Sequence, residues 1–159
     1  MRHDPKPLNA AEAVAFLRDA PPTERRVVEA LRLWLEGPEA QAAAWRAFAA
    51  DQGAEAGRVS LRAFEAYLLA VAEGAARRLR RHRLGCPCVA EDEAALAAAV
   101  AAAGCDDREA AYAALHGLVR PEAAPRAVAA AAALDRALAE RPADQGGSAA
   151  RAAPFRRLH

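Results

Sequence analysis

The longest predicted helix spans residues 60–83, with the sequence SLRAFEAYLLAVAEGAARRLRRHR. Its apolar side chains recur at intervals of three and four residues, which places them on one face of an α-helix. These residues are Leu61, Phe64, Leu68, Val71, Ala75 and Leu79. We expect this helix to be the central element of the fold, with Phe64, Leu68 and Val71 buried.

Shorter helices are predicted on both sides of the central one, because capping residues or Gly and Pro stand at their ends. A capping box of Asn9 and Glu12 begins the first helix, and a loop over residues 53–58 precedes the central helix. The helices expected before the central one cover residues 9–19, Thr23 to Gly37, and Pro38 to about Gly53. Those expected after it cover Glu91 to Gly104, Asp106 to Pro121, and Pro121 or Pro125 to Leu138.

The composition favours helices throughout the chain. Alanine accounts for 49 of the 159 residues and isoleucine is absent, so few residues favour β-strands. We therefore predict an all-α fold with no sheet: a compact bundle of six or seven helices that forms one domain over residues 9–140. Residues 141–159 are polar and rich in Gly and Pro, and are expected to form a flexible tail.

Charge and hydropathy limit the classes of protein to which the chain could belong. The formal net charge is only +1, which argues against a surface devoted to nucleic acid. The sequence has no apolar run of the roughly 18 residues that a membrane span needs. The charged N-terminal residues lack the features of a signal peptide, and the cysteine count of three is odd. A cytoplasmic protein without a membrane association is expected.

The segment from His82 to Cys88 holds the most distinctive chemistry of the sequence. It contains His82, Cys86 and Cys88, in the pattern His-x3-Cys-x-Cys at the end of the predicted central helix. Zinc in structural sites takes about four nitrogen or sulfur ligands, and a chain reversal after a helix can bring such ligands together. The hypothesis is a structural Zn²⁺ site formed by these three residues with Cys105 or His116. Thiols that only pack against their surroundings are the alternative.

Thiol redox chemistry is a further interpretation of the same residues. Nearby arginines and the N-terminus of the helix that begins at Glu91 would lower a thiol pKa, whereas the acidic residues there would oppose that effect. A thioredoxin-type site is not expected, because Cys86 and Cys88 are separated by one residue instead of two.

Five arginines precede the cysteines, and two interpretations of them stay open. They are Arg77, Arg78, Arg80, Arg81 and Arg83. At the C-terminus of a helix they would complement the backbone dipole. Alternatively they would form a basic patch for nucleic acid, although no aromatic residue lies among them to stack on bases.

No common catalytic signature is present. The sequence contains no G-x-S-x-G, no G-x4-G-K-[ST], no G-x-G-x-x-G and no H-E-x-x-H. We therefore do not expect an enzyme of an ordinary hydrolase or nucleotide-binding type.

The stretch from about Leu31 to Leu138 resembles a small all-helical family of GC-rich proteobacteria. The resemblance rests on His82, Gly85, Cys86, Cys88 and the pair Asp92-Glu93. The family has no activity assigned to it, so the resemblance implies a site at the cysteines without naming a reaction. The expected role is regulatory or protein-interacting, with another protein as partner. Nucleic-acid binding through the arginines is the alternative, followed by thiol redox activity.

Overall fold

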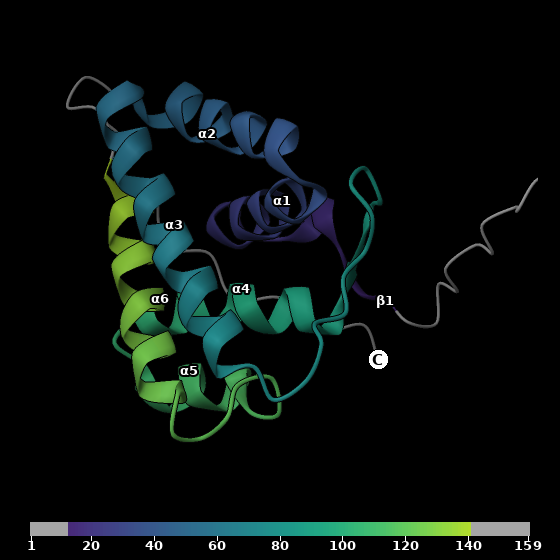
Figure 1. Ribbon diagram of the computed structural model, residues 1–159, viewed down its shortest axis with the longest axis vertical. Helices are drawn as coiled ribbons and strands as arrows, with labels where there is room; N and C mark the ends of the chain where they lie inside the picture. Colours follow the sequence, from purple (N-terminus) through teal and green to yellow (C-terminus); the bar gives the residue numbers. More distant parts are fainter. Residues whose placement is uncertain (1–12, 141–159) are drawn as a thin grey trace, which may run out of the picture.

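The computed structural model describes residues 13–140, which form six α-helices and a short two-stranded sheet (Figure 1). The helices are α1 (Pro22–Glu36), α2 (Pro38–Gln52), α3 (Ala54–Gly74), α4 (Glu91–Gly104), α5 (Arg108–Leu115) and α6 (Ala124–Ala139). The all-α class and the helix number are confirmed for this part of the chain. The tail predicted over residues 141–159 and the capping box at Asn9 lie outside the described residues.

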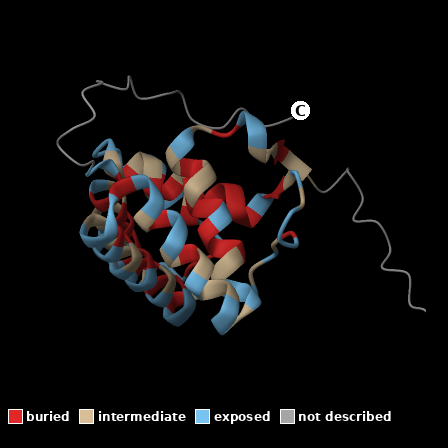
Figure 2. Cartoon of the chain, turned by 90° about the horizontal axis from the view of Figure 1, so that it is seen from above, coloured by how far each residue is buried: buried red, intermediate tan, exposed pale blue. Residues whose placement is uncertain are grey.

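Helices α4 and α6 pack against each other and link the remaining helices. Helix α3 contacts α2 and α6, and α4 contacts α1, α5 and α6 (Figure 1). Alanine occupies most positions of α4, so its neighbours approach closely and α4 is buried on almost every side. Figure 2 shows the buried residues gathered in the middle of the molecule, with exposed residues on the outer helix surfaces.

The predicted core face of α3 is largely confirmed. Phe64 and Val71 are fully buried, and Tyr67 is buried beside them and donates a hydrogen bond from its hydroxyl to the Leu96 carbonyl at 3.0 Å. Leu68 is only partly buried and packs against the core, so the prediction that it is buried was wrong. Trp34 of α1 and Phe48 of α2 pack against Phe64.

The helix predicted over residues 9–19 is wrong for the residues that the structure describes. Ala13–Phe16 form strand β1, and Leu17–Asp19 form a single 3-10 turn. Strand β1 pairs antiparallel with β2, Cys88–Ala90, through the register Phe16 to Cys88 and Ala13 to Ala90. The backbone of this segment therefore pairs with a partner more than 70 residues away in the sequence. The prediction of a fold without any sheet was therefore wrong, because these two strands form one.

Helix α3 begins earlier and ends earlier than predicted. The expected loop over residues 53–58 is helical from Ala54, and α3 stops at Gly74 instead of Arg83. Arg120 ends the helix: its side chain donates to the carbonyls of Glu73 and Ala75, and its backbone N–H donates to that of Gly74. With these carbonyls taken, the next turn of helix has no acceptors, and the chain leaves α3 in an extended form.

Candidate functional site

An extended segment carries the arginines and leads to the cysteines. We call residues 75–87 the arginine segment and residues 85–88 the cysteine turn. In Figure 1 the arginine segment leaves the end of α3, passes the N-terminus of α4, continues beside α1 and turns back into β2. Residues 77–87 do not form a helix. Other contacts must therefore hold this segment in place.

A buried ion pair lies beneath the arginine segment. Arg32 of α1 and Glu93 of α4 have side-chain exposures of only 2% and 0%. The Arg32 Nε donates to Glu93 Oε1 at 2.8 Å, and Nη2 donates to Oε2 at 2.7 Å, so the pair is bidentate. Such a pair fixes both side chains in one geometry. It joins α1 to the first turn of α4.

Both partners of this pair also bind the backbone of the crossing chain. Arg32 donates from Nη1 to the Cys86 carbonyl and from Nη2 to the Cys88 carbonyl, each at 2.6 Å. Glu93 accepts the backbone N–H of His82 at 3.1 Å and that of Ala90 at 2.9 Å. Every one of these bonds replaces a hydrogen bond that the irregular backbone would otherwise make to water. The cysteine turn is thus held through its main chain.

Asp92 anchors the earlier part of the arginine segment. Its carboxylate accepts two bonds from the Arg77 guanidinium, at 2.7 and 2.8 Å, and one from the Arg80 backbone N–H at 2.6 Å. Burial by itself would raise the pKa of Asp92, but these hydrogen bonds and the charges of Arg77 and Arg80 outweigh it and lower that pKa. The ionised carboxylate is therefore part of the folded structure.

Substitution of Asp92 by asparagine tests this pKa. A lowered folded-state pKa means that the stabilisation is complete above the unfolded pKa of about 3.9, and is lost as the pH falls through the lower folded value. We expect the wild type to be more stable than Asp92→Asn, with a constant difference in the free energy of unfolding from about pH 5 to 7. Below about pH 4 this difference should shrink. Urea unfolding followed by circular dichroism measures it. Asp51→Asn, which removes an exposed carboxylate paired with Arg26, is the matched control. A difference that stays the same down to pH 3 would contradict the assignment.

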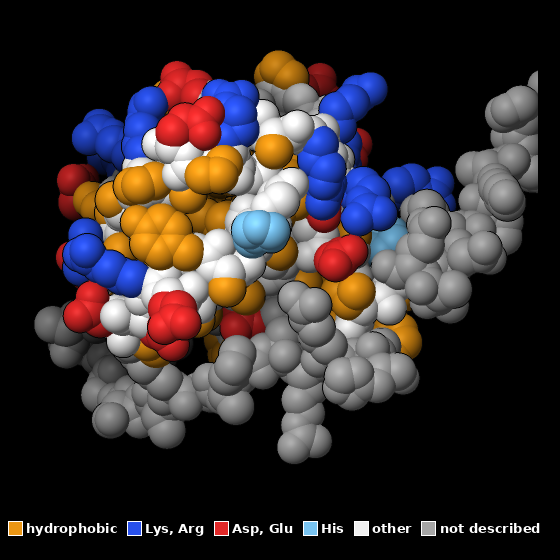
Figure 3. All heavy atoms as spheres, turned by 90° about the horizontal axis from the view of Figure 1, so that it is seen from below, with side chains coloured by type: hydrophobic (Ala, Val, Ile, Leu, Met, Phe, Trp, Pro, Cys, Tyr) orange, Lys and Arg blue, Asp and Glu red, His pale blue; other side chains and the backbone are white. Residues whose placement is uncertain are grey.

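The arginines do not complement a helix dipole, so that interpretation is wrong. Helix α3 ends before them, and three of the five are in ion pairs with carboxylates. Arg77 pairs with Asp92, Arg80 with Glu91 and Asp92, and Arg81 with Glu36. Arg78 and Arg83 are exposed and form no ion pair within the described chain. Figure 3 shows basic and acidic side chains interspersed on the lower face of the molecule, without one continuous basic field.

The residues predicted to bind zinc are only partly brought together. Cys86 and Cys88 lie close together in the cysteine turn, whereas Cys105 is exposed beyond the far end of α4, about 20 Å along the helix axis. His116 is exposed at the end of α5. His82 is buried and neither ring nitrogen has a hydrogen-bond partner. No group of three His, Cys, Asp or Glu suited to a metal ion occurs within residues 13–140. Zinc binding at this turn stays a prediction.

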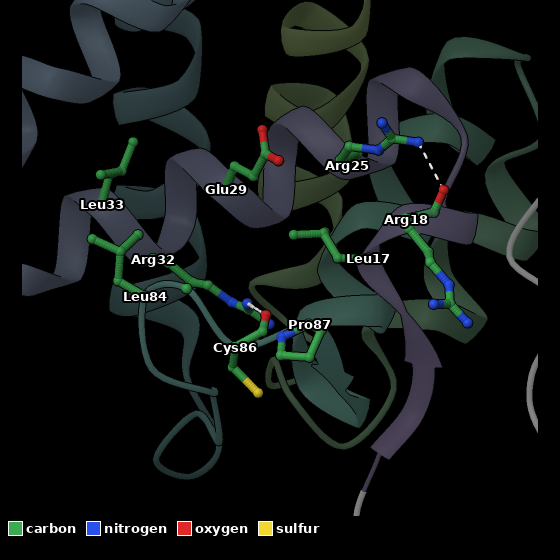
Figure 4. A pocket seen from close by; sticks show the side chains of 10 residues that line it. Leu17, Arg18, Arg25, Glu29, Arg32, Leu33, Leu84, Cys86 and Pro87 are labelled. Carbon is green, nitrogen blue, oxygen red and sulfur yellow. Dashed lines mark hydrogen bonds between the residues drawn. The ribbon is translucent and has the colours of Figure 1, made fainter.

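An open groove of about 600 Å³ borders the cysteine turn (Figure 4). It lies between the outer face of α1, the 3-10 turn and residues 84–87. Its apolar lining consists of Leu17, Leu33, Leu84 and Pro87, and its charged lining includes Arg18, Arg25 and Glu29. Arg25 donates from Nη2 to the carbonyls of Arg18 and Ala20 but pairs with no carboxylate in the described structure. Glu29, one helical turn further along α1, also lines the groove, so its charged lining contains an acidic group as well.

Comparison with known proteins gives no family for this chain: no family model, curated protein or solved structure matches it. The fold and the site define a compact helical protein in which an irregular segment is held across one end of a buried helix. None of the helices within residues 13–140 combines the length and the apolar content needed to cross a bilayer.

Proposed function

We propose that the protein is a small interaction module that binds a short segment of another protein in the groove between α1 and residues 84–87. The groove itself is the observation that carries this proposal. The 3-10 turn and α1, which are neighbours in the sequence, form one side of it and the distant residues 84–87 form the other, and the Arg32 contacts hold its cysteine side in place. A largely preformed apolar groove is a common binding site for protein segments.

The lining indicates the chemistry of the partner segment. Leu33 is half-buried and Leu84 is 50% exposed, so both offer apolar surface that a partner side chain would cover. Arg18, whose side chain is 80% exposed and lies 3.6 Å from the carboxylate of Asp19, and Arg25 place two guanidinium groups at one end of the groove. We infer that the partner segment carries a large apolar residue next to a carboxylate. An apolar contact would supply most of the affinity, and the carboxylate would set the orientation.

The proposed place of action is the cytoplasm. None of the three cysteines is in a disulfide, although Cys86 and Cys88 are separated by a single residue. Free thiols so close together are typical of proteins in a reducing compartment.

A peptide-display selection tests the proposed groove. The wild-type protein is used to select from a library of random linear peptides, and we expect enrichment of sequences with an apolar residue beside Asp or Glu. Affinity of a selected peptide is then measured with Leu33→Glu/Leu84→Glu and with Arg18→Glu. We expect each to weaken binding by about tenfold or more, and the Arg18 effect to diminish at high salt.

Leu69→Glu is the matched control, because Leu69 is 52% exposed on α3 and does not line the groove. It should bind the peptide as the wild type does. Thermal unfolding of every variant confirms that the fold is retained. The proposal is overturned if no peptide is enriched, or if the selected peptides bind Leu33→Glu/Leu84→Glu as tightly as the wild type.

A further inference from the structure

The cysteine turn presents two thiols close together. Cys86 and Cys88 are separated only by Pro87 and are both half-buried, and the Cys86 side chain is near enough to affect the Cys88 thiol. Burial, followed by the proximity of Cys86, raises the pKa of the Cys88 thiol, and the charge of Arg32 opposes this only in part. The two side chains are therefore close enough to influence each other's chemistry.

The backbone around the thiols is held by contacts that do not involve sulfur. The two terminal nitrogens of one guanidinium bind the carbonyls of Cys86 and Cys88, so both oxygens converge on Arg32. Between them Pro87 restricts its own φ angle. In Figure 4 the Cys86 side chain extends away from α1, while its carbonyl oxygen meets Arg32. This arrangement holds the backbone carbonyls of both cysteines against the same side chain.

From this geometry we propose that Cys86 and Cys88 form a reversible redox site that closes to a disulfide by exchange with low-molecular-weight disulfides. The Cys86 thiolate attacks one sulfur of the small disulfide, which breaks the S–S bond and releases one thiolate. The Cys88 thiol then loses its proton and attacks Cys86 in the mixed disulfide, which releases the second thiolate. In total, two protein thiols and one small disulfide give one protein disulfide and two small thiols, and the small disulfide is the oxidant.

The order of attack follows from the surroundings of the two sulfurs. A raised pKa makes Cys88 the poorer first nucleophile, and Cys86 lines the open groove, where a small disulfide can reach it. A disulfide between residues separated by one position closes a small, strained ring. Strained disulfides have more oxidising potentials, so this one would be reduced again readily by a thiol pool.

Exposure of the reduced protein to oxidised glutathione tests the proposal. Apart from any glutathione carried by Cys105, we expect the wild type to lose the mass of two hydrogen atoms in intact mass spectrometry, and to regain them with reduced glutathione. Alkylation before and after reduction should place the disulfide at Cys86 and Cys88. A glutathione adduct is expected only on Cys105, which is exposed.

The single variants distinguish this site from ordinary thiol modification. Cys86→Ser and Cys88→Ser should each stop at a glutathione adduct on the remaining cysteine of the turn, whereas Cys105→Ser should close the disulfide as the wild type does. The circular dichroism of each variant checks its fold. Stable glutathione adducts on Cys86 or Cys88 of the wild type, a disulfide that involves Cys105, or a disulfide between two chains would each overturn the proposal.

Discussion

Glu93→Ala is expected to lower the free energy of unfolding by about 3–5 kcal/mol, the largest effect of any single change in the site. The substitution leaves the Arg32 guanidinium buried at 2% exposure without its carboxylate. It also removes the acceptor for the backbone N–H groups of His82 and Ala90. A buried charge and two buried donors lose their partners together, and water cannot replace them without opening the fold.

Urea unfolding of Glu93→Ala and of a neighbouring control measures this effect. Glu91→Ala is the control, because Glu91 precedes Asp92 in the same helical turn but is 55% exposed and pairs only with the exposed Arg80. We expect Glu91→Ala to cost about 1 kcal/mol or less. If the two variants unfold at similar urea concentrations, the Arg32 and Glu93 pair does not hold the segment as described.

Phe64→Ala is expected to destabilise the protein by about 3–5 kcal/mol, as is usual for removal of a buried phenylalanine. Phe64 is fully buried where α1, α2 and α3 meet. Its ring lies 6.1 Å from that of Trp34 in an edge-to-face arrangement and 5.9 Å from that of Phe48. Truncation leaves a cavity and removes both ring contacts.

Thermal unfolding compares Phe64→Ala with Leu69→Ala on the same helix. Leu69 is 52% exposed, so its truncation is expected to change the unfolding free energy by only about 0.5 kcal/mol. The comparison separates loss of core packing from any change in the helix itself. An unfolding midpoint of Phe64→Ala equal to that of Leu69→Ala would show that the three aromatic residues do not pack as described.

Local sequence signals were sufficient where a helix has clear ends and a single apolar face. Helix α1 ends at Glu36, directly before the predicted stop at Gly37, and α4 starts at Glu91 as predicted. These local signals failed where contacts between residues distant in the sequence determine the backbone conformation. The apolar spacing continues from Val71 to Leu79, but Arg120, 46 residues after Gly74, takes the carbonyls that would continue α3. Likewise, nothing near Ala13 indicates that its strand partner begins at Cys88.

Only part of the candidate site could be predicted from the sequence. The cysteines and the pair Asp92-Glu93 stood out by their types and positions, but Arg32 did not. A signal was present: Arg32 lies four residues after Val28 and next to Leu31, on the apolar face of its helix. An arginine at such a position must either reach solvent or find a buried acid. Which acid it finds depends on how α1 and α4 pack, and that packing is a property of the whole fold.

The contacts of Arg32 with the cysteine turn are made to carbonyl oxygens, which every amino acid possesses. These contacts consequently do not depend on which side chains stand at positions 86 and 88. Residues of other kinds could be displayed at those two positions on an unchanged framework, so this protein could gain, lose or exchange the chemistry of the turn by point substitution without having to build a new fold.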